Sequence, residues 1–344
     1  MDFIPWCSAS ELPSLKKRGK IKAVSHWYLR IGRATDISTT AQRLLYRALE
    51  LQPGVLAWAT LIAIVAASFW VPTWAAVFII CFDIYWFIKT IYLSIHINHS
   101  FRKMRQNMAI DWRKKLRGLS STHPQLKGLS SDDILHVVIL PTAGEPYEVV
   151  RQGLEGLAKT SLPLDRLIVV LATEGRLGPQ AQAVRQQAEQ EFGSTFRHLL
   201  ATTHPDGIAG ELRGKGSNET WAGREMLRYI QENGIETRRV LVTVFDIDTI
   251  AHPEFFSCLT HSYLTSEHPL HSSFQPIPIF SNNIWHAPAF ARVVAVSTAF
   301  WQMVQQARPE QLVTVSSQSI SLQALIDVDF WQTNVVSEDS QIFW

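Results

Sequence analysis

The feature that most constrains this chain is an apolar run, residues 55–82, that contains no charged side chain. Such a run is too long for an ordinary buried helix, and its length suits a membrane span. Pro72 interrupts the run, and because proline cannot continue a helix from within, one helix is expected to end there and a second to begin at Trp74. We therefore predict a transmembrane helical hairpin over residues 51–96.

The two arms of this hairpin differ in how well they fit a bilayer. The first arm, residues 54–70, would rise about 25 Å at 1.5 Å per residue, which is close to the minimum for crossing the hydrocarbon layer. The second arm has to continue to about Ile95, which places Asp83 and Lys89 within the bilayer or at its edge, where an acid is costly without a partner or water. Alternatively, the interface begins earlier along this arm. A buried hairpin of a soluble protein is disfavoured because no polar residues alternate along the run.

Basic residues flank the apolar run on both sides. Residues 15–22 read LKKRGKIK, and residues 101–117 contain two further basic clusters. Because Lys and Arg are retained on the cytoplasmic side of a membrane, both flanks are predicted to be cytoplasmic, in a multi-pass membrane protein. We accordingly predict a basic cytoplasmic N-terminal segment over 1–50, a membrane-surface linker over 97–133 and a globular domain over 134–344.

The overall charge and the cysteines exclude some classes of function. The 32 Lys and Arg residues and the 30 Asp and Glu residues leave a net charge of +2. Nucleic-acid-binding domains carry a much stronger basic footprint, so nucleic acid is not a predicted partner. The three cysteines, Cys7, Cys81 and Cys258, are far apart and lack metal-ligand spacing, so they indicate neither a disulfide framework nor a zinc site.

Three short apolar runs rich in β-branched residues, each bounded by polar or turn residues, mark the start of the globular domain. They occupy residues 135–141, 166–174 and 238–248. Stretches with helical periodicity occupy residues 148–159, 179–192 and 218–232. Strands that alternate with helices of this length predict an α/β fold in which helices cover both faces of a mainly parallel sheet. Ligands of such folds bind at the carboxyl ends of the strands.

Acidic residues follow the last of these strands. Asp246 and Asp248 are one residue apart, so on an extended chain their side chains point the same way and can share one hard divalent cation. That cation could neutralise a diphosphate group. Upstream, the glycine-rich stretch 210–218 contains Lys215 and leads into a helix, an arrangement suited to phosphate. The sequence therefore predicts a phosphate-bearing ligand at this edge of the sheet.

Two more carboxylates, Glu338 and Asp339, follow an apolar pair near the end of the chain. Transfer of a sugar to a hydroxyl with inversion needs a carboxylate that removes the hydroxyl proton, and either residue could be that general base. Taken alone, such a pair is more often a solvated helix start. Trp331 is a candidate for stacking on a sugar, although large aromatic residues are more often core residues.

Four motifs occur in a definite order along the globular domain. They are Pro-Thr-x-x-Glu at 141–145, Gly-Lys with a following helix at 214–223, Asp-x-Asp at 246–248 and Glu-Asp at 338–339. In order and approximate spacing they resemble the family 2 glycosyltransferases, the large group that includes the cellulose and hyaluronan synthases. The resemblance covers about residues 134–344 and implies the Rossmann-like GT-A fold, here preceded by the transmembrane hairpin.

The resemblance implies roles for the residues that bind the donor. Thr142 and Glu145 would line the nucleotide pocket. Glu174 would approach the base, at a position where the family often has Asp. Lys215 would lie near the nucleotide or its diphosphate.

The resemblance also implies a metal site and a base. Asp246 and Asp248 would contact the diphosphate and a bound Mg²⁺ or Mn²⁺, with Asp248 the closer ligand. Asp339 would be the catalytic base, and Glu338 would support it.

The implied activity is that of an inverting hexosyltransferase. It would move a sugar from a nucleoside-diphosphate sugar, with a UDP-sugar as the first expectation, to a lipid-linked or polysaccharide acceptor at the membrane. Two alternatives stay open: a catalytically silent membrane subunit that binds a sugar nucleotide, and a nucleotidyltransferase of similar fold, which also uses paired acids and a metal. The family continues beyond its Glu-Asp pair into further membrane spans, so we expect the chain to be truncated at its C-terminus.

Overall fold

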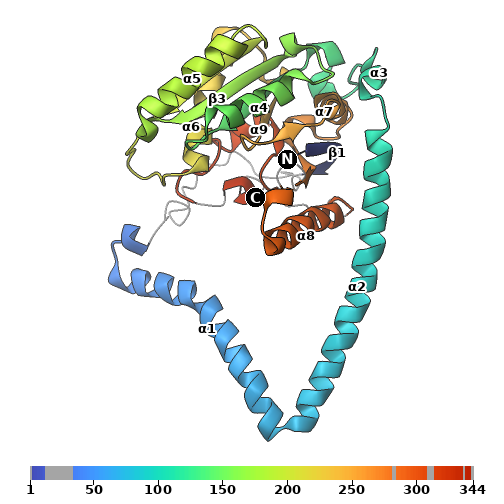
Figure 1. The fold of residues 1–344 in the computed structure, drawn as a ribbon, viewed down its shortest axis with the longest axis vertical. Coiled ribbons are helices and arrows are strands. Elements are labelled where there is room, and N and C mark those ends of the chain that lie inside the picture. The colour runs from blue at the N-terminus through green and yellow to red at the C-terminus, as the bar shows by residue number, and fades with distance from the viewer. Residues whose placement is uncertain (1, 12–33, 281–283, 308–313, 336–337, 342–344) are drawn as a thin grey trace. The chain divides into compact units, whose positions relative to one another are not determined.

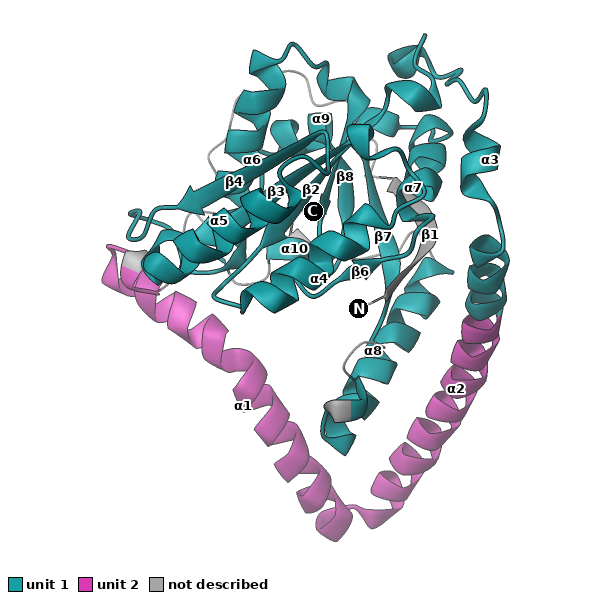
Figure 2. Cartoon of the chain, turned by 45° about the horizontal axis from the view of Figure 1, so that its top comes forward, with its two compact units in different colours: residues 1–18, 99–344 teal, residues 19–98 magenta. Residues whose placement is uncertain are grey.

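The computed structural model describes residues 2–11, 34–280, 284–307, 314–335 and 338–341 (Figure 1). The chain forms two compact units, one made of residues 1–18 and 99–344 and the other of residues 19–98 (Figure 2). The basic cluster at 15–22 lies outside the described residues.

Residues 19–98 contain the two predicted apolar helices. Helix α1 spans Thr40–Trp70 and helix α2 spans Pro72–Met108, whose last turns belong to the larger unit. The helices are separated only by Val71, and Pro72 is the first residue of α2, a position where its missing N–H costs nothing. The second helix therefore begins two residues before the predicted Trp74. Each helix has a mean hydropathy of 1.8 over its most apolar 18 residues, so length and composition allow both to cross a membrane.

The larger unit is built on an eight-stranded sheet with strand order β4-β3-β2-β5-β8-β7-β1-β6. The strands β4, β3, β2 and β5 are parallel, whereas β8 and β7 run antiparallel to their neighbours and β6 pairs parallel with β1. The strands are β1 Asp2–Glu11, β2 Leu135–Pro141, β3 Leu167–Glu174, β4 His198–His204, β5 Val240–Val244, β6 Ile250–Ala251, β7 Ser272–Ile279 and β8 Ser319–Ser321. The predicted α/β fold with a mainly parallel sheet is confirmed, and all three predicted strands are present.

Helices cover both faces of this sheet, as predicted. One core layer contains α4, α5 and α7, and the other contains α6 and α9. Side chains along β2 point alternately into the two layers. Val138 and Leu140 lie in the first layer, and Val137 and Ile139 lie in the second. The helices of the larger unit are α3 Trp112–Leu116, α4 Tyr147–Ala158, α5 Pro179–Phe192, α6 Lys215–Glu232, α7 Phe255–Leu264, α8 Ala289–Gln306, α9 Leu322–Asp327 and α10 Glu338–Gln341.

Short 3₁₀ turns connect these elements. They are η2 Ala34–Asp36, η3 Pro124–Leu126, η4 Ser131–Asp133, η5 Leu164–Arg166, η6 Gly175–Leu177, η7 Thr237–Arg239, η8 Pro269–His271 and η9 Ile284–His286.

Two stretches outside the predicted domain are part of the larger unit. Strand β1, within the predicted cytoplasmic segment 1–50, pairs antiparallel with β7 from Asp2↔Ile279 to Glu11↔Ser272. Within the predicted linker 97–133, Leu126 and Leu129 are buried in the core layer of α4, α5 and α7. The globular unit therefore includes chain that we assigned to flanking segments, because neither the pairing of β1 with the distant strand β7 nor the burial of two leucines in a mostly polar stretch has a local signal in the sequence.

Helix α4 lies unusually close to the loop that follows β5. A Cβ atom at Gly153 would lie 2.6 Å from the carbonyl oxygen of Ile247, the residue between Asp246 and Asp248. Backbone atoms cannot move aside as a flexible side chain can. The absence of a side chain at Gly153 thus lets the helix support the acidic loop directly.

We predict that Gly153→Ala lowers the free energy of unfolding by about 1–3 kcal/mol, the usual cost of overpacking a core. Denaturant unfolding of the full chain in detergent measures the change. The matched control is Gly54→Ala in α1, where an added Cβ meets nothing within 4 Å. That control should leave stability unchanged or raise it, because alanine favours a helix. Equal stability of Gly153→Ala and the unaltered chain would contradict the close packing.

Candidate active site

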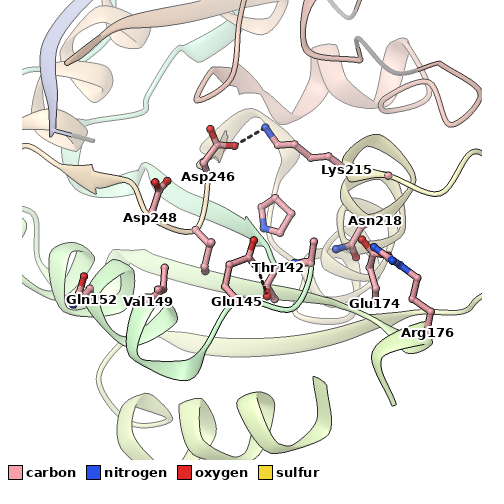
Figure 3. A pocket seen from close by; sticks show the side chains of 14 residues that line it. Thr142, Glu145, Val149, Gln152, Glu174, Arg176, Lys215, Asn218, Asp246 and Asp248 are labelled. Carbon is pink, nitrogen blue, oxygen red and sulfur yellow. Dashed lines mark hydrogen bonds and ion pairs between the residues drawn. The ribbon is translucent and has the colours of Figure 1, made fainter. Parts of the chain in front are cut away.

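A cavity of about 650 Å³ opens at the carboxyl ends of β2, β3 and β5 (Figure 3). This is the edge at which the topology of a parallel sheet predicts a ligand site. Six of the eight residues that the sequence assigned to the donor, the metal and the base line it, namely Thr142, Glu145, Glu174, Lys215, Asp246 and Asp248. Of the other two, Asp339 contacts Lys215, and Glu338 lies beside Asp339.

The turn after β2 is held by its own side chains. Both the Thr142 hydroxyl and the backbone N–H of Ala143 donate hydrogen bonds to Oε2 of Glu145, at 2.8 and 2.7 Å. The backbone N–H of Thr142 donates to the carbonyl oxygen of Ala172 in β3, at 2.9 Å. One oxygen of Glu145 is therefore used to shape this wall of the cavity.

Asp246 and Asp248 lie on a turn and not on an extended strand. Strand β5 ends at Val244, and the N–H of Thr249 donates to the carbonyl oxygen of Asp246 at 2.9 Å, which closes the turn. The premise that an extended chain orients both carboxylates is therefore wrong. Both side chains line the cavity nonetheless (Figure 3), because the turn brings them to the same edge.

Lys215, the first residue of α6, connects the acidic turn to the end of the chain. Its Nζ lies 2.9 Å from Oδ1 of Asp246, 3.3 Å from Oδ2 of Asp339 and 3.5 Å from Oε1 of Glu219. Nζ also donates to the hydroxyl of Ser316 at 3.1 Å, and that hydroxyl donates to Oδ2 of Asp246. Burial lowers the pKa of Lys215, but the carboxylates outweigh burial and hold it above the ordinary value for lysine. Lys215 therefore stays charged.

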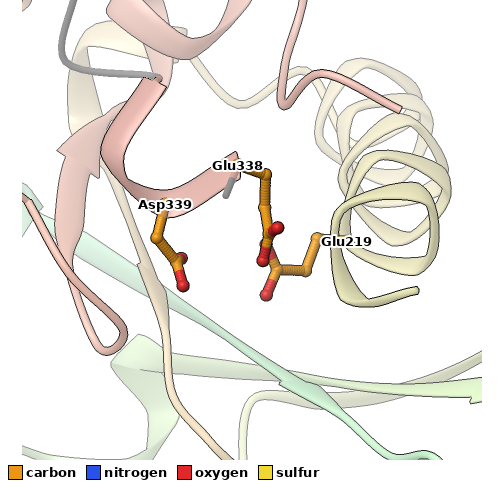
Figure 4. Close-up of side chains that lie close together, drawn as sticks. All are labelled: Glu219, Glu338 and Asp339. Carbon is orange, nitrogen blue, oxygen red and sulfur yellow. The ribbon is translucent and has the colours of Figure 1, made fainter. Parts of the chain in front are cut away.

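Glu219, Glu338 and Asp339 form a carboxyl cluster beside Lys215 (Figure 4). One oxygen from each lies within 4.8 Å of the other two, and no other such group of three potential ligands occurs in the described part of the chain. Glu219 has no exposed surface, and neither of its oxygens accepts a hydrogen bond from a described residue.

The cluster holds more carboxyl groups than the charge of one lysine can balance. Burial raises the pKa of Glu219 well above its usual value and raises the pKa of Glu338 and of Asp339, while Lys215 opposes each rise. The Lys215–Glu219 distance would suit an ion pair, but Lys215 is already balanced by Asp246 and Asp339 at shorter distances. We infer that Glu219 carries a proton, since buried like charges this close cannot all ionise.

Sequence reasoning missed three residues of the site. Glu219 lies one helical turn after Lys215, so the i,i+4 spacing could have identified it. Arg176 lines the cavity and forms an ion pair with Glu174, two residues before it in sequence. Ser316 has no local signal, because its role depends on contacts with residues far away in the chain.

Trp331 does not reach the cavity. Its side chain is 2% exposed and lies in the core layer of α6 and α9. The suggestion that it stacks on a sugar is therefore wrong, and the more common role of a large aromatic residue applies.

No family model and no curated protein matches this sequence. Among solved structures, the chain is similar to the mannosyltransferase PcManGT from Pyrobaculum calidifontis in complex with GDP-Man and Mn²⁺, with 17% identity, a TM-score of 0.39, and 73% of this chain and 61% of that chain covered. It is also similar to S. aureus TarS 1–349, with 13% identity, a TM-score of 0.34, and coverage of 61% and 54%. The chain thus spans less than two thirds of either structure. Likeness at this level carries no argument about activity.

If Glu219 carries a proton in the folded protein, its carboxyl makes stability depend on pH. The folded state binds this proton more tightly than the unfolded chain does. Relative to Glu219→Gln, the unaltered protein should therefore lose free energy of unfolding as the pH rises from about 4.3 towards the raised pKa, by up to about 1.4 kcal/mol per pH unit.

Denaturant unfolding of both proteins across this pH range measures the difference. Glu232→Gln, at an exposed position of the same helix, is the matched control for replacing a glutamate. Parallel stability curves for Glu219→Gln and the unaltered protein would show that Glu219 does not bind a proton on folding.

Proposed function

We propose that this chain is a glycosyltransferase that moves a sugar from a nucleoside-diphosphate sugar to a hydroxyl, with inversion. One observation supports this most strongly: Lys215 contacts both Asp246 in the acidic turn and Asp339 near the chain end, beside the cavity at the carboxyl ends of the parallel strands. A group that stabilises a leaving diphosphate and a group that removes a proton are the two requirements of the reaction. The order of the four motifs supports the further assignment to family 2.

The residues of the acidic turn fit a hard divalent cation. Asp246 and Asp248 offer only carboxylate oxygens, the donors that Mg²⁺ and Mn²⁺ prefer. Asp246 is held in place by Lys215 and Ser316, as the ligands of metal sites usually are by their neighbours. When bound, the cation would neutralise charge on the diphosphate.

The carboxyl cluster suits proton transfer better than it suits a cation. The ammonium group of Lys215 already lies next to Asp339 and Glu219 and provides the positive charge there. Glu219, which we infer to be protonated, would have to lose its proton before it could bind a cation. We therefore assign the metal to the acidic turn and the base to the cluster.

The donor would lie along the cavity between the turn after β2 and the end of β3. We propose that Thr142 and Glu145 form the wall against the nucleotide and that Glu174 approaches the base, with a UDP-sugar as the favoured donor. Lys215 would stabilise the diphosphate through its charge.

We propose that Asp339 is the general base that activates the acceptor. Its carboxylate would take the proton of the acceptor hydroxyl as the oxygen forms a bond to the anomeric carbon. On the opposite face the bond from that carbon to the diphosphate breaks, and the nucleoside diphosphate leaves with the bonding electrons. Burial raises the pKa of Asp339, which makes it a stronger base than an exposed aspartate. Glu338, next to it and buried, would keep it in position.

We also propose that the chain is anchored in a membrane. The helices α1 and α2 would cross it, both basic flanks would lie in the cytoplasm, and the catalytic unit would act there on a lipid-linked or polysaccharide acceptor. The support is the length and apolar composition of the two helices and the positive charge that flanks them in the sequence.

Donor turnover by the full chain in detergent, followed as release of free nucleoside diphosphate, tests the proposal. We predict that Asp339→Asn loses at least about 100-fold in turnover, the lower bound of what a general base contributes, and that Asp248→Ala is similarly impaired. Asp329→Asn, at an exposed position with positive φ that asparagine tolerates, is the control and should retain full activity. Unchanged turnover in both site variants would refute the mechanism.

The product identifies which of the candidate activities is present. Free nucleoside diphosphate supports sugar transfer, whereas pyrophosphate would mean nucleotidyl transfer. Donor binding without turnover, across several acceptors, would instead support the silent binding subunit.

We predict that turnover also depends on a divalent cation. Chelation with EDTA should abolish release of nucleoside diphosphate, and added Mg²⁺ or Mn²⁺ should restore it. Turnover that persists after exhaustive chelation would contradict the assignment of Asp246 and Asp248 as metal ligands.

A further inference from the structure

Helix α8 of the globular unit presents a broad apolar surface to its surroundings. We call this the α8 apolar face, and it consists of residues that are between 42% and 75% exposed: Phe290, Val293, Val294, Val296, Phe300 and Trp301. Single exposed apolar residues are ordinary, but a contiguous patch of large ones marks an interaction surface. Figure 2 shows that α8 projects away from the sheet.

The other end of α8 is firmly attached. Met303 is buried together with Ile277 of β7 and Met104 in the last turns of α2. The side-chain amide of Gln306 donates to the backbone carbonyl of Gln275 at 2.5 Å. The exposure of the α8 apolar face therefore belongs to a helix that is packed on the sheet at one end only.

In the exposed part of α8, the hydroxyls and the guanidinium group bond to the helix itself or to the turn that precedes it. The hydroxyl of Ser297 donates to the carbonyl oxygen of Val293 at 2.7 Å, and that of Thr298 donates to Val294 at 3.0 Å. Arg292, the only charged residue of α8, donates to the carbonyl oxygen of Ala287 at 3.0 Å.

Hydroxyl groups in the two helices proposed to span the membrane also donate to carbonyl oxygens of their own helix. Thr60 of α1 donates to Leu56, and Thr90 of α2 donates to Trp86, both at 2.8 Å. Such a bond gives the hydroxyl a partner in a medium that offers none.

We propose that the α8 apolar face inserts into the surface of a lipid bilayer. This inference rests on the membrane part of the proposed function. Along α2, Met104 comes nine residues after Ile95, the predicted end of the second arm, and lies within the basic stretch FRKMR at 101–105. At 1.5 Å per residue this distance is at most about 14 Å, which puts Met104 just outside the headgroup layer, and the 13 residues from Met303 back to Phe290 provide about 20 Å of helix, enough to reach the bilayer surface. A helix that reaches this surface buries its apolar face among headgroups and acyl chains.

The side chains of this region suit lipid better than a protein partner. Trp301 and Trp285, which lies in the turn η9 before α8 and is 76% exposed, are of the type enriched at membrane interfaces. The α8 apolar face has no ionisable side chain that could fix the register of a protein partner. Protein interfaces usually surround their apolar centre with a polar rim that performs this function.

Photocrosslinking in the full chain tests the inference. The chain is reconstituted into vesicles of phosphatidylcholine and phosphatidylglycerol, with p-benzoylphenylalanine introduced as Val294→Bpa or, aromatic for aromatic, as Phe290→Bpa. Gln186→Bpa, on an exposed part of α5, is the negative control, and Ile62→Bpa in α1 reports on the membrane spans. After irradiation, both α8 variants and Ile62→Bpa should gain the mass of one phospholipid, and Gln186→Bpa should not.

Several outcomes would overturn the inference. Adducts of the α8 variants to a second copy, or to another segment of the chain, would mean that protein covers the face. No adduct at α8 with lipid adducts at Ile62→Bpa would leave the membrane spans in place and refute only the inference. No lipid adduct at either place would refute membrane anchoring as well. Release of nucleoside diphosphate is measured independently, so none of these results bears on sugar transfer itself.

Discussion

The ammonium group of Lys215 is the interaction on which the candidate site depends. It joins three segments that lie far apart in the sequence, namely the start of α6, the turn after β5 and the short helix α10. Because the surrounding carboxyl groups outnumber it, the site holds both a fixed positive charge and, on Glu219, an inferred proton. In the proposed reaction, a half-buried lysine among several acids would thus stabilise a leaving diphosphate while a carboxylate beside it accepts a proton.

Close backbone packing makes this arrangement possible. A Cβ at Gly216 would lie 2.9 Å from the side chain of Glu338, and a Cβ at Gly153 would meet the backbone of Ile247. Glycine at both places lets helices approach the acidic segments more closely than any other residue would allow. The glycines therefore set the positions of the carboxylates, although neither contributes a functional group.

Apolar surface serves two purposes in this protein. In the globular unit it forms the two core layers on either side of the sheet. In α1, α2 and the first turns of α8 it stays exposed, while the hydroxyls of Thr60, Thr90 and Ser297 on these helices bond to the backbone of their own helix. Together, these features describe a catalytic unit that, in our proposal, works at a membrane surface, where an acceptor with a lipid anchor would be presented.

The sequence by itself determined the elements whose signal is local. The apolar run gave two helices, the β-branched runs gave β2, β3 and β5, and the acids after β5 indicated the edge that the cavity occupies, since hydrophobic periodicity and strand polarity act over short distances. Only the tertiary structure decided the antiparallel half of the sheet, the addition of β1, the burial of Trp331 and the parts played by Glu219 and Ser316. Each of these depends on contacts between residues that are distant along the chain, and no short pattern encodes which distant segments meet.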